Sequence, residues 1–115
     1  MAKRFVERAR RFQVSRKGEL RLDEQRFNGL IQNISQNGMF VVGNYDLEVG
    51  MELWIKVDLA PGLPFDGKIK VRHFDDGCFG AEIVEADPQS RRNWKQFLET
   101  HYAGQSELPE RRSRL

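Results

Sequence analysis

Two groups of side chains in this sequence have the types and the spacing to bind a nucleotide-like anion. Asn33, Ser35 and Gly38 form an N-x-S-x-x-G turn between two apolar runs, and Arg4 and Arg8 form an R-x-x-x-R pair in an arginine-rich N-terminal arm. A guanidinium is a planar, charged fork that can bind phosphate oxygens or the O6/N7 edge of guanine and can stack on a purine. Asn33 and Ser35 can hydrogen-bond a guanine edge, and Gly38 permits either a backbone conformation closed to other residues or a ligand lying against the main chain. Together the two groups predict a site for a planar, polyanionic molecule such as a guanine nucleotide.

The two motifs differ in how much they indicate. With thirteen arginines in 115 residues, about one R-x-x-x-R pair is expected by chance, whereas the N-x-S-x-x-G pattern is expected roughly 0.04 times. The alternative for the turn is an ordinary β-turn in which Asn33 and Ser35 bond their own backbone. The alternative for the arginines is a solvated charge run, and we expect Arg10, Arg11 and Arg16 to be solvated in this way. The order of the two motifs and their placement around a strand favour a ligand site.

The charge of the chain is unevenly distributed, although the formal net charge is only +2. Residues 1–17 carry seven basic side chains and one acid, so the rest of the chain is mildly acidic. A basic arm on an acidic body predicts an anionic partner at the arm. Cys78 is the only cysteine, the charged N-terminus lacks the apolar segment of a signal peptide, and no apolar run is long enough to span a bilayer. We therefore expect a cytoplasmic protein that does not insert into membranes.

Short apolar segments separated by turn residues predict an all-β fold. In the clearest of them, 51–57, apolar and polar residues alternate strictly. Leu30-Ile31 breaks the alternation of another segment, and Gly29 is expected to permit a bulge there. Asp75-Asp76-Gly77 is typical of a hairpin turn. The six segments are 18–22, 27–34, 39–42, 51–57, 68–72 and 79–84. Six short antiparallel strands predict a small closed or nearly closed β-barrel, since closure removes exposed strand edges.

One α-helix is expected to end the domain. Asp87 is a suitable N-cap, Pro88 suits the first helical position and Gly104 is a suitable stop. Trp54 is expected to pack beneath this helix. An apolar stripe is expected to lie across the barrel, and it consists of Trp94, Phe97, Leu98, His101 and Tyr102. The expected organisation is therefore a flexible basic arm (1–17), a barrel with its helix (18–104) and a disordered polar tail (105–115).

In this arrangement the chain resembles the PilZ family, whose bacterial members bind the second messenger cyclic di-GMP. The resemblance runs from Lys3 to about Tyr102 and covers the arm, the six strands, the polar turn and the closing helix. Val49-Gly50-Met51-Glu52-Leu53 resembles the start of a middle strand of the family. Val71-Arg72-His73, followed by Phe79-Gly80-Ala81-Glu82-Ile83, resembles the last hairpin.

The resemblance implies a fold, a ligand and a set of contact residues. The fold would be a six-stranded PilZ-like barrel, and the ligand would be cyclic di-GMP, with no separate cofactor. A basic residue before the R-x-x-x-R pair, here Lys3, favours a stacked pair of ligands over a single one. Binding would order the arginine arm over the barrel and signal to a protein effector partner. The implied contacts are Lys3, Arg4, Arg8, Asn33, Ser35 and Gly38.

Three other functions fit the sequence less well. A PilZ-like protein-interaction module without nucleotide binding would typically lack the arginine pair or the polar turn, and both are intact. A binder of nucleic-acid polymers would expose aromatic rings among basic residues on its strands, and few occur. An enzyme is not indicated, because no nucleophile–base pair is apparent. His73 and His101 stand apart from any metal-ligand cluster, and Cys78 is expected to lie in the core.

Overall fold

The computed structural model describes residues 11–43 and 45–105, with the side chains of 101–105 left undescribed. The predicted contacts Lys3, Arg4 and Arg8 lie outside the described residues, as do most of the arm and the tail from residue 106. Within the described part of the chain, no helix has both the length and the apolar character required to cross a membrane.

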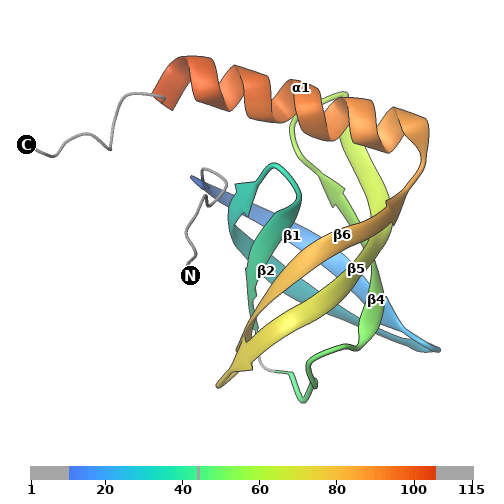
Figure 1. Cartoon of the computed structure of the whole chain (residues 1–115). Helices are drawn as coiled ribbons and strands as arrows, with labels where there is room; N and C mark the ends of the chain where they lie inside the picture. Colours follow the sequence, from blue (N-terminus) through green and yellow to red (C-terminus); the bar gives the residue numbers. More distant parts are fainter. Residues whose placement is uncertain (1–10, 44, 106–115) are drawn as a thin grey trace, which may run out of the picture.

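Six antiparallel strands form a closed barrel with one helix after the last strand (Figure 1). The barrel closes where β1 pairs with β4, for example at Gly18 and Val57. Around the barrel the strand order is β1-β2-β3-β6-β5-β4. The elements are β1 (Phe12–Leu22), β2 (Gln25–Ser35), β3 (Gly38–Val42), β4 (Glu52–Asp58), β5 (Pro64–Asp75), β6 (Cys78–Ala86) and α1 (Pro88–Gln105). The predicted all-β, six-stranded barrel with a C-terminal helix is confirmed.

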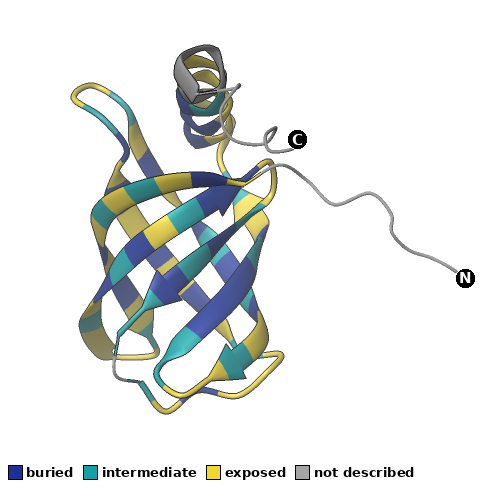
Figure 2. Ribbon diagram, turned by 90° about the vertical axis from the view of Figure 1, so that its left-hand side faces the viewer, coloured by how far each residue is buried: buried dark blue, intermediate teal, exposed yellow. Residues whose placement is uncertain are grey.

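The core fills the barrel because side chains alternate between its two faces. In β4, Leu53, Ile55 and Val57 are buried while the residues between them are exposed. Figure 2 shows the same alternation of buried and exposed residues along the other strands. The β5–β6 hairpin turns at Asp76 and Gly77, whose φ angles of 48° and 87° are those of a two-residue turn that matches strand twist.

Strand β1 begins earlier than the sequence indicates, which corrects the expected start at Gly18. It starts at Phe12, which is buried and pairs with Ile34. Arg16 and Lys17, which continue the basic arm, concealed the strand in the sequence. In the barrel, Lys17 is exposed and Arg16 is half-buried, so the charge lies on the outer face of a strand whose first residue fills the core.

The bulge in β2 also differs from its expected position at Gly29. Gly29 pairs regularly with Gly18, and the pairing shifts instead between Ile31 and Asn33, at Gln32. Gly29 has another use, because a Cβ there would lie within contact distance of the hydroxyl oxygen of Tyr45.

Tyr45 packs over this glycine from the loop after β3. Its hydroxyl donates to the carbonyl oxygen of Asn28 at 2.6 Å, and its ring lies 5.0 Å from that of Phe27 and 5.7 Å from that of Phe79. Burial, with a smaller contribution from Cys78, raises the pKa of the Tyr45 hydroxyl. The predicted apolar setting of Cys78 is only partly realised, since this residue is half-buried at the start of β6.

Helix α1 begins as the sequence predicts and lies across one end of the barrel (Figure 1). The Asp87 carboxylate accepts a hydrogen bond of 2.7 Å from the backbone N–H of Ser90, which is an N-cap contact. The Ser90 hydroxyl in turn accepts one of 3.0 Å from the backbone N–H of Asp66. Trp94 and Phe97 are buried against the barrel. The helix is therefore fixed at its first turn and through its aromatic side chains.

Trp54 does not pack beneath α1, contrary to the sequence prediction. Its ring is 37% exposed on the outer face of β4, and the Lys68 ammonium lies 5.1 Å from its centroid. Phe65 occupies the position beneath the helix, with its ring 4.8 Å from that of Trp94. Because successive residues of a strand point to opposite faces, a tryptophan between Leu53 and Ile55 faces outward.

Candidate functional site

The polar turn joins β2 to β3 at the end of the barrel near α1. Ser35 pairs with Gly38, and Gln36 and Asn37 form the connection. The turn is anchored to β6 as well, because the carbonyl oxygen of Asn37 accepts a 2.9 Å hydrogen bond from the backbone N–H of Ile83. The predicted residues Asn33, Ser35 and Gly38 are thus brought together on one hairpin.

The register shift at Gln32 decides where Asn33 points. Without it, Asn33 would share the inward face with Ile31, because residues two apart in a strand lie on the same face. With it, the buried positions are Ile31 and Ile34, and Asn33 is half-exposed. β-Bulges re-aim single side chains beside functional sites in this way. The register shift therefore leaves the side-chain amide of Asn33 accessible at the surface immediately before the turn, instead of burying it in the core.

Asn33 is contacted by an arginine that the sequence analysis treated as solvated. The Arg11 guanidinium donates a 2.7 Å hydrogen bond to Oδ1 of Asn33. The contact arises because Gln13 of β1, two residues after Arg11, pairs with Asn33 in β2. It places a positive charge directly beside the turn. No sequence signal distinguished Arg11 from its neighbours, since the contact depends on strand register.

Arg16, also expected to be solvated, has a structural role. Its Nε donates a 2.6 Å hydrogen bond to the carbonyl oxygen of Leu59, and its guanidinium lies 5.6 Å from the centre of the Phe97 ring. These contacts hold α1 against the barrel away from the turn.

Gly38 is required by the barrel itself. A Cβ at this position would lie 2.7 Å from the carbonyl oxygen of Ala81 in β6. Its φ is not among the positive values, which belong to Gly50, Gly62 and Gly77 among the described glycines. Of the two roles considered for Gly38, an unusual backbone conformation is wrong. The other role, a ligand lying against the main chain, stays a prediction. In the structure, the group that a Cβ at Gly38 would meet is the backbone of β6.

Ser35 is buried, at 6% exposure, and it connects the turn to the helix. The indole N–H of Trp94 donates to the carbonyl oxygens of Ser35, at 3.1 Å, and Gln36, at 3.2 Å. The sequence places Trp94 in the apolar stripe, and helical spacing gives no signal of this polar contact. The turn and α1 are therefore joined by hydrogen bonds as well as by apolar contact.

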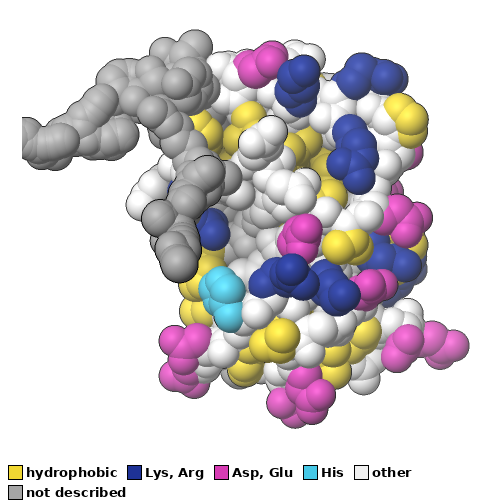
Figure 3. Space-filling model, viewed as in Figure 1, with side chains coloured by type: hydrophobic (Ala, Val, Ile, Leu, Met, Phe, Trp, Pro, Cys, Tyr) yellow, Lys and Arg dark blue, Asp and Glu magenta, His cyan; other side chains and the backbone are white. Residues whose placement is uncertain are grey.

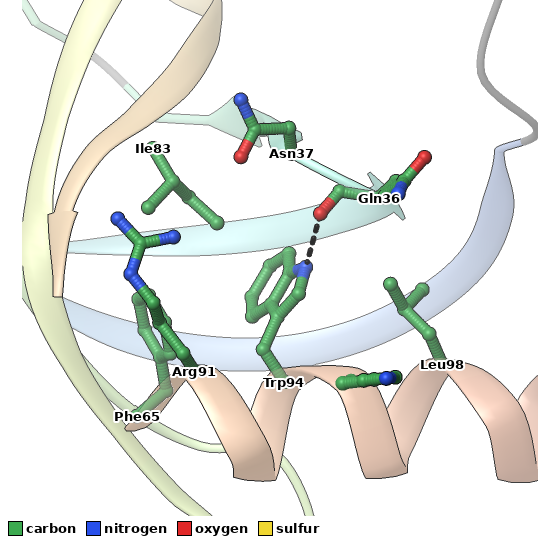
Figure 4. Close-up of a pocket in the computed structure, with 8 residues that line it drawn as sticks. Gln36, Asn37, Phe65, Ile83, Arg91, Trp94 and Leu98 are labelled. Atoms are coloured by element: carbon green, nitrogen blue, oxygen red, sulfur yellow. Dashed lines mark hydrogen bonds between the residues drawn. The ribbon is translucent and has the colours of Figure 1, made fainter. Parts of the chain in front are cut away.

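A cavity of about 530 Å³ lies between α1 and the turn (Figure 4). Apolar side chains line its interior and polar side chains line its opening. Gln36 and Asn37 form the side that belongs to the turn. The lining residues are Gln36, Asn37, Phe65, Ile83, Arg91, Trp94, Lys95 and Leu98. Among the described residues, no group of His, Cys, Asp and Glu side chains is arranged to hold a metal ion.

Comparison with protein-family models gives a match to the PilZ domain over residues 4–100. The chain belongs to the PilZ domain family. This family is known for receptors of cyclic di-GMP, and PilZ domains are binding or regulatory modules. The match includes the R-x-x-x-R pair, the polar turn and most of α1. Comparison with curated proteins gives no match.

Three solved structures share the PilZ barrel. The chain is similar to the Bacillus subtilis inhibitor of motility (MotI/DgrA), with a TM-score of 0.73 and 19% identity over 90% of this chain and 55% of that one. It thus spans about half the length of that protein. The PilZ domain of YcgR from Escherichia coli, solved with cyclic di-GMP, gives a TM-score of 0.68 at 14% identity over 85% and 92% of the two chains. The PilZ domain of CeSA from a cellulose-synthesizing bacterium gives 0.66 at 12% identity over 80% and 97%. At these identities the likeness concerns the fold.

Proposed function

We propose that this PilZ domain is a non-catalytic receptor for cyclic di-GMP, in which the ligand lies on the barrel wall beside Asn33, Ser35 and Gly38. Arg4 and Arg8 of the arm bind its phosphates and guanine edges, and the arm becomes ordered over the ligand. The change in the arm then signals to a protein effector partner, so that the domain acts as an adaptor. With Lys3 before the arginine pair, the proposed ligand is a stacked pair of dinucleotides.

The observation that carries this proposal is the register of β1 and β2. Phe12 and Gln13, at the start of β1, pair with Ile34 and Asn33, at the end of β2. The arm consequently joins the barrel beside the polar turn. Arg8 precedes Arg11 by three residues, and three residues span at most about 10 Å. Because the Arg11 side chain contacts Asn33, an arginine within this distance of Arg11 along the chain is able to contact a ligand held beside the turn.

The charges and the energies are consistent with such a ligand. Arg11 already contributes a positive charge at the turn through its 2.7 Å contact with Asn33. Charge-assisted hydrogen bonds contribute roughly 1.5–3 kcal/mol each, while ordering the arm costs about 1–2 kcal/mol for each residue immobilised. A micromolar dissociation constant requires about 8 kcal/mol net. Several arginine contacts are therefore needed, which supports a role for both members of the pair.

The location inferred for this receptor is the bacterial cytoplasm. Cys78, the single cysteine, cannot form a disulfide within the chain, and proteins of a reducing compartment typically lack disulfides.

Calorimetric titration of the full chain with cyclic di-GMP tests the proposal. We expect the natural chain to bind and the Arg8→Ala variant to show no measurable binding, with its melting temperature nearly unchanged. The matched control is Arg21→Ala, which removes the same charge at the far end of β1, about 30 Å from Phe12. Arg21 pairs with Arg26 at the opposite end of the β1–β2 hairpin, so this variant should bind normally.

Two results would contradict the receptor function. A folded natural chain that gives no heat at high micromolar cyclic di-GMP would favour the alternative, a protein-interaction module without nucleotide binding. A large loss of stability in Arg8→Ala would instead identify that arginine as a structural residue.

A further inference from the structure

The groove between α1 and the polar turn has the composition of a binding site rather than of a packing gap. Its volume of about 530 Å³ lies within the usual range for ligand pockets. Phe65, Ile83 and Trp94 are buried side chains that form its apolar walls, and Leu98 is half-exposed. Figure 3 shows hydrophobic side chains reaching the surface on the barrel side of α1, with Lys and Arg side chains nearby.

The rim of this groove carries positive charge only. Arg91 and Lys95 line it, and none of the lining residues is acidic. Both cations are exposed, and within the described part of the chain neither side chain has an ion-pair or hydrogen-bond partner. Elsewhere on the barrel, Lys68 and Arg72 are paired with glutamates. The groove thus offers two uncompensated cations above an apolar floor.

The spacing of the two cations limits what can occupy the groove. Arg91 and Lys95 are four residues apart on one helix face, which places their Cβ atoms about 5–6 Å apart. Figure 4 shows Arg91, Trp94 and Leu98 extending from successive turns of α1 toward the residues of the turn. A matching occupant has an apolar side chain for the floor and two carboxylates about one helical turn apart for the rim.

We propose that this groove docks an acidic, apolar segment of a protein partner, with a leucine- or phenylalanine-sized side chain between two carboxylates. Charge complementarity with Arg91 and Lys95 selects the acidic segment, and the apolar walls select the side chain between the acids. This proposal goes beyond the proposed receptor function and does not require it, because no dinucleotide contact is involved. Its position is nevertheless informative, since Gln36 and Asn37 of the polar turn form one wall of the groove.

The test is a titration of the full ¹⁵N-labelled chain, without dinucleotide, followed by NMR. The probe is a synthetic ten-residue peptide in which leucine pairs alternate with glutamate pairs, and the control probe carries lysine in place of every glutamate. We expect the acidic peptide to shift the Trp94 indole N–H signal and the backbone amide signals of Gln36 and Asn37. The lysine peptide should leave them in place.

Charge reversal supplies the second arm of the test. In a variant carrying both Arg91→Glu and Lys95→Glu, the acidic peptide should bind at least tenfold more weakly. The lysine peptide should bind this variant more tightly than it binds the natural chain. The control variant is Arg72→Glu, which reverses a cation on β5 that does not line the groove and should bind the acidic peptide normally. Circular dichroism of each variant confirms that the fold is retained.

Several outcomes would overturn the docking proposal. Equal binding of both peptides, or binding that survives the double reversal, would show that charge does not select the occupant. Shifts of the same signals that depend on protein concentration would assign the groove to a second copy of the chain. If removing residues 106–115 shifts the Trp94, Gln36 and Asn37 signals without any peptide, the occupant of the groove is the chain's own tail, in which Glu107 and Glu110 flank Leu108 and Pro109. Failure of the separate cyclic di-GMP titration would count against the receptor function alone.

Discussion

The two tryptophans of this chain offer a direct test of how α1 is attached to the polar turn. Trp94 is 4% exposed, and its indole N–H donates to two carbonyl oxygens of the turn, at 3.1 and 3.2 Å. Replacing it with phenylalanine keeps an aromatic ring next to Phe65 and removes the donor. The substitution therefore separates the hydrogen bonds of the helix from most of its apolar contact.

The expected cost follows from the groups left unpaired. A buried polar group that loses its partner costs about 1–3 kcal/mol, and the smaller ring leaves some space unfilled, so we expect Trp94→Phe to lose about 2–3 kcal/mol of unfolding free energy. For a domain of this size, each kcal/mol lowers the melting temperature by about 4–8 °C. Urea denaturation and thermal unfolding, both followed by far-ultraviolet circular dichroism, measure these quantities.

The matched control is the same substitution at Trp54. This ring is 37% exposed and has a cation–π contact with Lys68 at 5.1 Å, a type of contact that contributes about 0.5–1 kcal/mol at exposed sites. Trp54→Phe should therefore lose less than about 1 kcal/mol. If both variants are destabilised equally, the indole hydrogen bonds do not hold the helix to the turn, and the structural link between α1 and the site is wrong.

Two further substitutions test the structural roles of residues around the barrel. Gly38→Ala should destabilise the fold by about 1–3 kcal/mol, as overpacking does, because its Cβ would lie 2.7 Å from the carbonyl oxygen of Ala81. The control is Gly18→Ala, where the nearest atom is a side-chain carbon at 3.4 Å, and it should lose clearly less unfolding free energy in urea denaturation. Equal losses in the two variants would contradict this account. Burial, with a smaller contribution from Cys78, raises the folded-state pKa of Tyr45 above its ordinary value of 10.0. The stability that neutral Tyr45 contributes is therefore fully present below about pH 10 and is lost as pH rises through the raised pKa. Tyr45→Phe should thus be less stable than the natural chain at neutral pH, and the gap should narrow above pH 10 in denaturation curves; a constant gap would mean that the hydroxyl does not titrate with unfolding.

The barrel was predictable from the sequence because its signals are local. The alternation in 51–57 and the Asp76-Gly77 turn each specify a conformation without reference to distant residues. The same is true of the Asp87 cap, whose carboxylate bonds the N–H three residues along the chain. Local signals failed at the start of β1, where charged residues occupy the solvent face of a strand. They also misplaced the bulge of β2 and the packing of Trp54, which both depend on neighbouring strands.

The candidate site was predictable in part. The N-x-S-x-x-G spacing identified the turn, and the structure joins its three residues on one hairpin. The contact between Arg11 and Asn33 was not predictable, because it depends on the pairing of residues some twenty positions apart and on a register shift at Gln32. The pairing of a strand responds to packing on both of its faces, which a pattern along one segment does not describe.

The sequence by itself determined the family, the six strands, the helix and the residues of the polar turn, since periodicity, turn chemistry and motif spacing are properties of neighbouring residues. Only the tertiary structure decided the orientation of Asn33, the contact of Gly38 with β6, and the groove beneath Arg91 and Lys95. These features exist because closing the barrel brings β1 and β6 against the turn and sets α1 across its end. Contacts of this kind are fixed by the joint packing of segments that are distant in the chain.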